Sequence, residues 1–188
     1  VKGNKAVAEA DLPVFYCPSR RDGVRPQDLP IMFNNWTAGG NDYGGCVGGC
    51  NGWHNCGAHE SWVVAEGRRP ASECKGVFRV NSNTNFGQIT DGSSNTFLLG
   101  ELQRLNGGTD VTTSRDGWAV GSSSTMFSSC SDQCLGPNSP HFEEAGSEHS
   151  GGCNISLADG SVRFLSQYTN VTILQALGSI AGDGPASF

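Results

Sequence analysis

The sequence predicts an α+β fold in which a mainly antiparallel β-sheet carries a few short helices and long loops. Short apolar runs that favour strands outnumber the runs with helical periodicity. The 27 glycines indicate many turns and much irregular backbone. Eight cysteines are typical of an oxidising compartment, so we expect disulfides to hold these loops. The length allows one large domain or two small ones, and we expect a single domain over residues 1–188.

The clearest local pattern is a β-hairpin near the C-terminus. Asp159-Gly160 predicts a two-residue type I′ turn, because both central positions of that turn need a positive φ. The turn would place Leu157 opposite Val162 and Ile155 opposite Phe164. Both apolar pairs then share one face, so turn chemistry and period-2 alternation predict the same register.

The other elements follow from apolar runs and caps. A short helix is expected over residues 4–10 with Asn4 as its N-cap, and another over 171–180 with Asn170 as its N-cap. The run at 95–102 lacks alternation, which favours a strand buried on both faces. Strands are expected at residues 14–17, 31–33, 76–80, 95–102 and 118–120, residues 62–64 form a further apolar run, and residues 121–140 are expected to be a Ser-rich loop.

A Cys- and Gly-rich stretch at about 37–60 is expected to be an irregular insertion. It holds three cysteines together with His54 and His59, residue types that also bind zinc. The spacing fits no common zinc module, so disulfides are favoured over a metal. The disulfide candidates, whose pairing the sequence leaves open, are Cys17, Cys46, Cys50, Cys56, Cys74, Cys130, Cys134 and Cys153.

Four sequence blocks carry a family resemblance. They are residues 15–21 (FYCPSRR), residues 41–45 (NDYGG), residues 76–78 leading to 89–101 (ITDGSSNTFLLGE), and His149 followed after nine residues by Asp159-Gly160. In this order they resemble a group of bacterial secreted proteins, abundant in planctomycetes and made with a prepilin-type N-terminus. The resemblance implies a pilin-like globular domain at the cell surface, with His149, Asp159 and Gly160 as a structural motif.

The resemblance also bears on how the sheet is covered. Pilin-like domains normally pack their sheet on a long apolar N-terminal helix, and we expect that helix to be absent from this chain. No apolar run approaches the roughly 20 residues of a membrane-spanning helix. One sheet face must therefore be covered by loops or by a partner chain.

Catalysis is not expected. His149 and Asp159 would suit a base and its orienting carboxylate, but the hairpin should hold them far apart. The sequence has neither a Gly-x-Ser-x-Gly elbow nor a His-Glu-x-x-His pair. The formal net charge of −6 argues against a nucleic-acid partner.

Two weaker patterns offer ligand sites. Asp91 and Asn95 have oxygen ligands that suit calcium, with Glu101 a more distant candidate, and no other cofactor is expected. Four aromatic residues gather near the insertion: Trp36, Tyr43, Trp53 and Trp62. If exposed, they could stack on sugar rings or dock a protein partner, but packing into a small core of the insertion itself is favoured.

Together these patterns favour a secreted, pilin-like structural or surface-interaction protein, a subunit of an extracellular filament or cell-surface assembly. Its partner would be a protein, either further copies of itself or a surface complex. The first alternative is a carbohydrate-binding or adhesin module that uses the aromatic residues of the 36–62 region on a polysaccharide. A metal-dependent hydrolase is a distant third.

Overall fold

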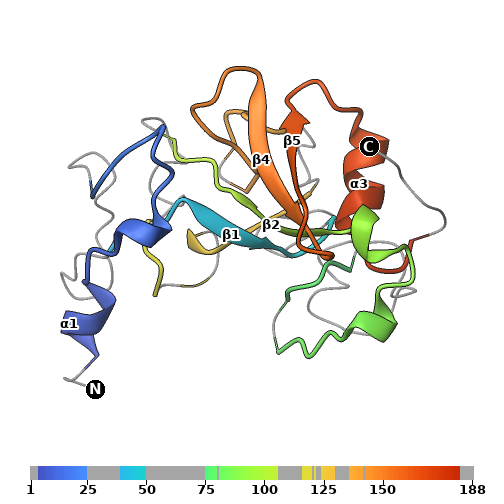
Figure 1. Cartoon of the computed structure of the whole chain (residues 1–188), viewed down its shortest axis with the longest axis horizontal. Helices are drawn as coiled ribbons and strands as arrows, with labels where there is room; N and C mark the ends of the chain where they lie inside the picture. The colour runs from blue at the N-terminus through green and yellow to red at the C-terminus, as the bar shows by residue number, and fades with distance from the viewer. Residues whose placement is uncertain are drawn as a thin grey trace.

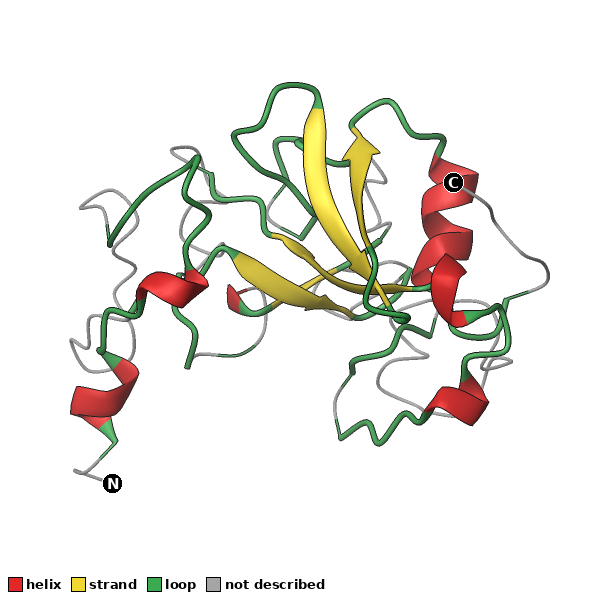
Figure 2. Ribbon diagram, viewed as in Figure 1, coloured by secondary structure: helices red, strands yellow, loops and turns green. Residues whose placement is uncertain are grey.

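The structure is a computed structural model, and it describes residues 4–24, 39–49, 75–79, 81–105, 116–119, 121, 124–129, 136–141 and 143–182. Its strands are β1 (Tyr43–Cys46), β2 (Phe97–Glu101), β3 (Met126–Phe127), β4 (Gly152–Leu157) and β5 (Val162–Ser166). Its helical segments are α1 (Lys5–Ala8), η1 (Pro13–Phe15), η4 (Phe86–Gln88), η5 (Ser93–Asn95) and α3 (Val171–Gly178). Short helices around one sheet make an α+β fold (Figures 1 and 2). The predicted strand at 31–33 and the apolar run at 62–64 lie outside the described residues.

The sheet is mixed, with the strand order β3-β1-β2-β4-β5. Three neighbouring pairs are antiparallel, as predicted, but β1 and β3 run parallel, with Gly45 opposite Met126. The prediction missed β3, because Met126–Phe127 is a two-residue strand inside a Ser-rich segment that lacks any alternation.

The predicted irregular insertion is wrong where it covers β1. This strand pairs on both sides and its sequence is Tyr-Gly-Gly-Cys. A Cβ added to Gly44 would lie 2.7 Å from the side chain of Leu102, and one added to Gly45 would lie 2.5 Å from the Phe78 ring. Side chains therefore lie close against both faces of the β1 backbone, which is possible because glycine has no side chain. The same glycines leave β1 without the alternating apolar residues of an ordinary strand.

The β4–β5 hairpin forms, but its predicted register is wrong by one residue. Ser156 lies opposite Val162, and Asn154 lies opposite Phe164. Within the turn, only Gly160 has a positive φ, at +84°, so the connection is not a type I′ turn. A shift of one residue reverses the two faces of a strand, so Val162 and Phe164 point away from the core.

Hydrogen bonds explain the longer turn. The Gly160 N–H donates to the Leu157 carbonyl at 2.9 Å, and the Leu157 N–H donates to the Ser161 carbonyl at 2.8 Å. The Asp159 carboxylate accepts from the backbone N–H and the hydroxyl of Ser161, at 2.9 and 2.7 Å. Asp159 thereby stabilises a three-residue loop that ends in a left-handed glycine.

One face of the sheet packs into the hydrophobic core, and α3 covers it beside β5 (Figure 1). The predicted helix is confirmed, and the Asn170 side chain accepts from the Thr172 N–H at 2.8 Å, as its N-cap role requires. The buried cluster comprises Cys46, Phe97, Leu102, Phe127, Ala145, Cys153, Ile155, Leu157, Leu165, Leu174 and Leu177.

Disulfides are not supported for the described cysteines. Cys17, Cys46 and Cys153 are buried free thiols. Burial raises the pKa of Cys46 to about 12 and also raises that of Cys153, so both remain neutral and pack as small apolar side chains. The other five cysteines lie outside the described residues.

Other local predictions are also corrected. Residues 14–17 contain no strand, because Pro13 begins the helical turn η1 instead. Residues 76–79 contain no strand, and Trp118 with Ala119 forms a turn. Helix α1 forms within the predicted range, but the Asn4 side chain makes no capping hydrogen bond. The strand at 97–101 is confirmed, but Leu99 is 43% exposed, so β2 is not buried on both faces.

No helix in the described part of the chain is long and apolar enough to cross a bilayer.

Candidate functional site

The sheet side opposite the core, here called the outer face, has a polar end and an apolar end. Gly100 lies on the core side, because a Cβ added there would meet Ile155 and Phe127. By alternation its neighbours Leu99 and Glu101 belong to the outer face. Tyr43 lies opposite Glu101 on β1, and this end of the outer face is where the polar side chains gather.

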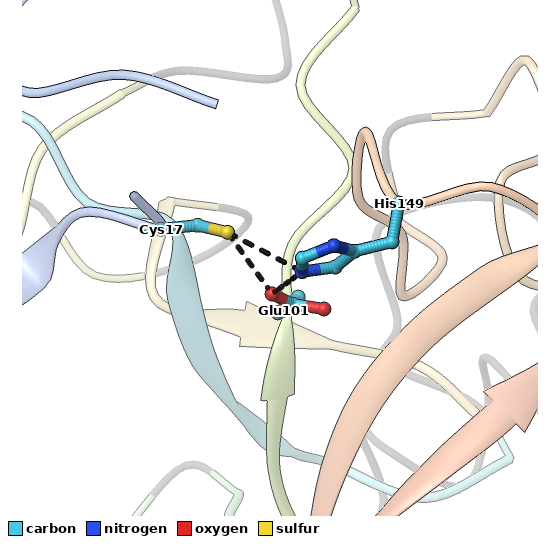
Figure 3. A group of neighbouring side chains, drawn as sticks. All are labelled: Cys17, Glu101 and His149. Atoms are coloured by element: carbon cyan, nitrogen blue, oxygen red, sulfur yellow. Dashed lines mark hydrogen bonds and ion pairs between the residues drawn. The ribbon is translucent and has the colours of Figure 1, made fainter. Parts of the chain in front are cut away.

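At the polar end three side chains from distant segments converge: Cys17, Glu101 and His149, here called the Cys–Glu–His cluster (Figure 3). The Cys17 thiol donates to Glu101 Oε1 at 3.2 Å. His149 Nε2 lies 3.0 Å from the same oxygen and 3.6 Å from the Cys17 sulfur. The three atoms therefore form a small triangle between the N-terminal segment, the end of β2 and the loop before β4.

The second oxygen of Glu101 fixes the direction of its carboxylate. Oε2 accepts from the Asn154 backbone N–H at 2.6 Å and from the Asn154 side-chain amide at 3.3 Å. These bonds leave Oε1 to face Cys17 and His149. Glu101 is only 3% exposed, and its described hydrogen-bond partners are Cys17, His149 and Asn154. These partners replace the water that a buried carboxyl group loses.

The neighbouring segments hold the other two side chains in place. The Cys17 backbone N–H donates to Asp42 Oδ2 at 3.0 Å. The His149 backbone N–H donates to the Ser147 hydroxyl at 3.0 Å, which in turn donates to the Gly152 carbonyl at 2.7 Å. Backbone hydrogen bonds thus hold Cys17 and His149 in place, and Asn154 holds Glu101.

The electrostatics keep Cys17 protonated in this arrangement. Burial raises the pKa of Cys17, and its hydrogen bond to Glu101 raises it further, while the backbone N–H groups of Ser19 and Arg20 act in the opposite direction. Burial, together with the nearby acidic side chains, likewise raises the pKa of Tyr43 to about 12. The Cys17 thiol therefore stays neutral while it donates to Glu101.

A buried ion-pair network centred on Arg21 lies next to Cys17. Arg21 donates through Nε and Nη2 to Asp42 at 3.1 and 2.7 Å, and through Nη1 and Nη2 to Asp116 at 2.5 and 3.1 Å. Its guanidinium also lies 4.8 Å from the centre of the Tyr16 ring. Burial would lower the pKa of Arg21, but Asp116 and Asp42 raise it overall. Asp42 connects this network to the Cys17 backbone.

All four blocks that carry the family resemblance meet at this place. Cys17 belongs to the block at 15–21, Asp42 to that at 41–45, and Glu101 ends the block at 89–101. His149 opens the fourth block. Segments separated by 84 and 132 positions from Cys17 are thereby brought to one cluster.

The other predicted site residues lie elsewhere. Asp159 and Gly160 form the hairpin tip, and His149 contacts Cys17 and Glu101 rather than Asp159. Asp91 Oδ2 accepts from the Gly182 N–H at 2.5 Å, and the Asn95 amide faces the Asp91 carbonyl. The sugar-stacking candidates Trp36, Trp53 and Trp62 lie outside the described residues, with His54, His59, Cys50, Cys56, Cys74, Cys130 and Cys134. Tyr43, the described aromatic candidate, is half-buried beside the cluster.

The geometry of the cluster distinguishes between a catalytic Cys–His pair and a metal site. In a Cys–His nucleophile pair, the thiol contacts one ring nitrogen while the orienting carboxylate holds the other. Here Cys17 and Glu101 both meet His149 at Nε2. Three ligand atoms that face a common centre are instead the arrangement of a metal site. Among the described residues, no other group of His, Cys, Asp and Glu side chains converges in this way.

The fold and the cluster define an α+β domain whose mixed sheet carries one Cys–Glu–His cluster on its outer face. A protein family described as "Protein of unknown function (DUF1559)" matches residues 2–172. The chain belongs to this family. Comparison with curated proteins and with solved structures finds no match.

Proposed function

We propose that the protein is a secreted, pilin-like structural subunit of a cell-surface or extracellular assembly, that it performs no catalysis, and that it associates with further copies of itself. The observation that carries this proposal is an exposed apolar strip on the outer face, formed by Leu99, Val162 and Phe164. These side chains are 43%, 66% and 51% exposed. The secreted, pilin-like character rests on the resemblance of the four blocks.

The strip spans three strands, with the polar Ser156 of β4 between Leu99 and Val162. Leu99 on β2 lies opposite Ser156 on β4, and Ser156 lies opposite Val162 on β5. Phe164 lies two residues further along β5 on the same face. Large apolar side chains that share a surface favour contact with another protein over contact with water.

The strip ends at an edge of the sheet. Among the strands that the structure describes, β5 pairs with β4 on one side and is last in the order. Exposed strand edges pair readily with other strands, and natural proteins protect them with charges, proline or bulges. β5 holds a single charged residue, Arg163, and no proline. A second copy fits this edge, because two β5 strands can pair antiparallel and bring their apolar strips together.

Sedimentation velocity over a concentration series tests this association. The wild-type chain is expected to sediment faster as its concentration rises. The double substitution Val162→Lys with Phe164→Lys should keep the chain monomeric, because it places charges in the strip and at the edge. Both side chains point away from the core, so the fold should be retained, which circular dichroism checks.

A matched control uses another exposed aromatic residue. Phe86 is 75% exposed in η4, outside the sheet, so Phe86→Lys should assemble as the wild type does. A wild-type chain that stays monomeric at every concentration would overturn the self-association, as would a double variant that assembles normally.

A further inference from the structure

We propose that the Cys–Glu–His cluster is a zinc-binding site in which Cys17 Sγ, Glu101 Oε1 and His149 Nε2 are the ligands. A thiolate, a carboxylate and an imidazole together suit a borderline-soft divalent ion such as zinc. This inference is independent of the proposed self-association, because the ligands lie at the polar end of the outer face.

The distances agree with a tetrahedral ion. Zinc bonds of about 2.3 Å to sulfur, about 2.0 Å to nitrogen and about 2.1 Å to oxygen place tetrahedral ligand atoms about 3.4–3.6 Å apart. The Cys17 sulfur lies 3.6 Å from His149 Nε2. The contacts of Glu101 Oε1 to sulfur and to nitrogen are shorter, at 3.2 and 3.0 Å, as expected where hydrogen bonds hold the ligands before an ion separates them.

Surrounding groups orient the ligands as they do in metal sites. The two hydrogen bonds from Asn154 to Oε2 turn Oε1 toward the centre. Zinc would displace the proton of the Cys17 thiol, which now donates to Glu101 Oε1. The cluster therefore needs little rearrangement to accept an ion.

The site has a way in and an open coordination position. The His149 side chain is 28% exposed, whereas that of Glu101 is 4% exposed, so solvent reaches the cluster from the His149 side. Three protein ligands leave a fourth position for water.

A bound ion would tie together segments that are distant in the chain. It would join the N-terminal segment to β2, 84 positions away, and to the loop before β4, 132 positions away. Because the three ligands converge only in the folded chain, the ion would bind the folded state and stabilise it against unfolding. We therefore infer that zinc, with water as its fourth ligand, stabilises the folded chain.

The experiment is a titration of the full chain with zinc alone, after dialysis against a chelator. We expect one site per chain to form with the ligand atoms named above, and the midpoint of thermal unfolding to rise with zinc concentration. Cobalt(II) in place of zinc should give the charge-transfer absorption of a thiolate ligand, and calcium should not compete. Cys17→Ser and His149→Gln should each weaken zinc binding by about 100-fold or more.

Cys46→Ala serves as the matched control, because Cys46 is also a buried free thiol but lies in the core. It should keep both the zinc affinity and the cobalt absorption even if the free energy of unfolding falls. Absence of zinc binding to the wild-type chain would overturn the inference. So would unchanged zinc affinity and cobalt absorption in Cys17→Ser and His149→Gln, since the ion would then be held by other residues.

Discussion

Arg21→Met is expected to lower the free energy of unfolding by about 3–5 kcal/mol, because it removes one partner from a buried ion-pair network. The Arg21 side chain is 1% exposed and makes four hydrogen bonds to the carboxylates of Asp42 and Asp116. Without it, both carboxylates lose their main cation while they remain inside the protein. Urea unfolding followed by tryptophan fluorescence measures the change.

Arg20→Met is the matched control. Arg20 precedes Arg21, and its side chain is 2% exposed, but its nearest approach to Asp42 is 3.9 Å. Its Nε and Nη1 atoms have no hydrogen-bond partner among the described residues. Arg104, 3.8 Å from Asp116, still accompanies Arg21 when Arg20 is removed. We expect a cost well below that of Arg21→Met, and equal losses in the two variants would contradict the described network.

Leu165→Ala should lower the free energy of unfolding by about 2–5 kcal/mol, whereas Phe164→Ala should change it by about 0.5 kcal/mol. In the structure Leu165 is 2% exposed and belongs to the core, while the larger Phe164 is 51% exposed. The same unfolding measurement on both variants compares neighbouring residues of one strand.

This pair of variants separates the two registers of the hairpin. A type I′ turn at Asp159-Gly160 would turn Phe164 inward with Ile155 and leave Leu165 outside. The longer turn does the reverse, since it pairs Asn154 with Phe164 and Cys153 with Leu165. A larger loss for Phe164→Ala than for Leu165→Ala would show that the register described here is wrong.

The hairpin illustrates how far the sequence alone could predict this fold. Alternation located both strands and Asp-Gly located the turn, but an Asp-Gly pair is compatible with two loop lengths that differ by one residue. Choosing between them depends on whether Asp159 takes a positive φ or instead accepts hydrogen bonds from Ser161, as it does here. The apolar residues of β5 could satisfy either choice, because Val162, Phe164 and Leu165 occupy both faces.

Strand β1 shows a different limit. Its two central residues are glycines because Leu102 and Phe78 approach the backbone from either side. A tertiary contact of this kind requires glycine where a strand would otherwise have a side chain. The sequence of β1 therefore lacks the alternation from which a strand is predicted. Helix α3, by contrast, was predictable from Asn170 and the apolar spacing, which act locally.

The sequence singled out His149 but not its partners in the cluster. Cys17 was assigned to a disulfide and Glu101 to a distant calcium role, because spacing within short motifs cannot show contacts across 84 or 48 positions. A signal was nevertheless present, since each of these residues lies in a different block of the family resemblance. Blocks that are far apart in a chain and carry metal-binding residue types are worth considering as one site.

The measurement that tests the zinc site most directly is zinc K-edge X-ray absorption on the purified full chain. The structure predicts about one sulfur ligand at about 2.3 Å and two or three nitrogen or oxygen ligands at about 2.0–2.2 Å, which corresponds to Cys17, His149, Glu101 and a water. A shell of three or four sulfur atoms, or a spectrum without bound zinc, would contradict this account.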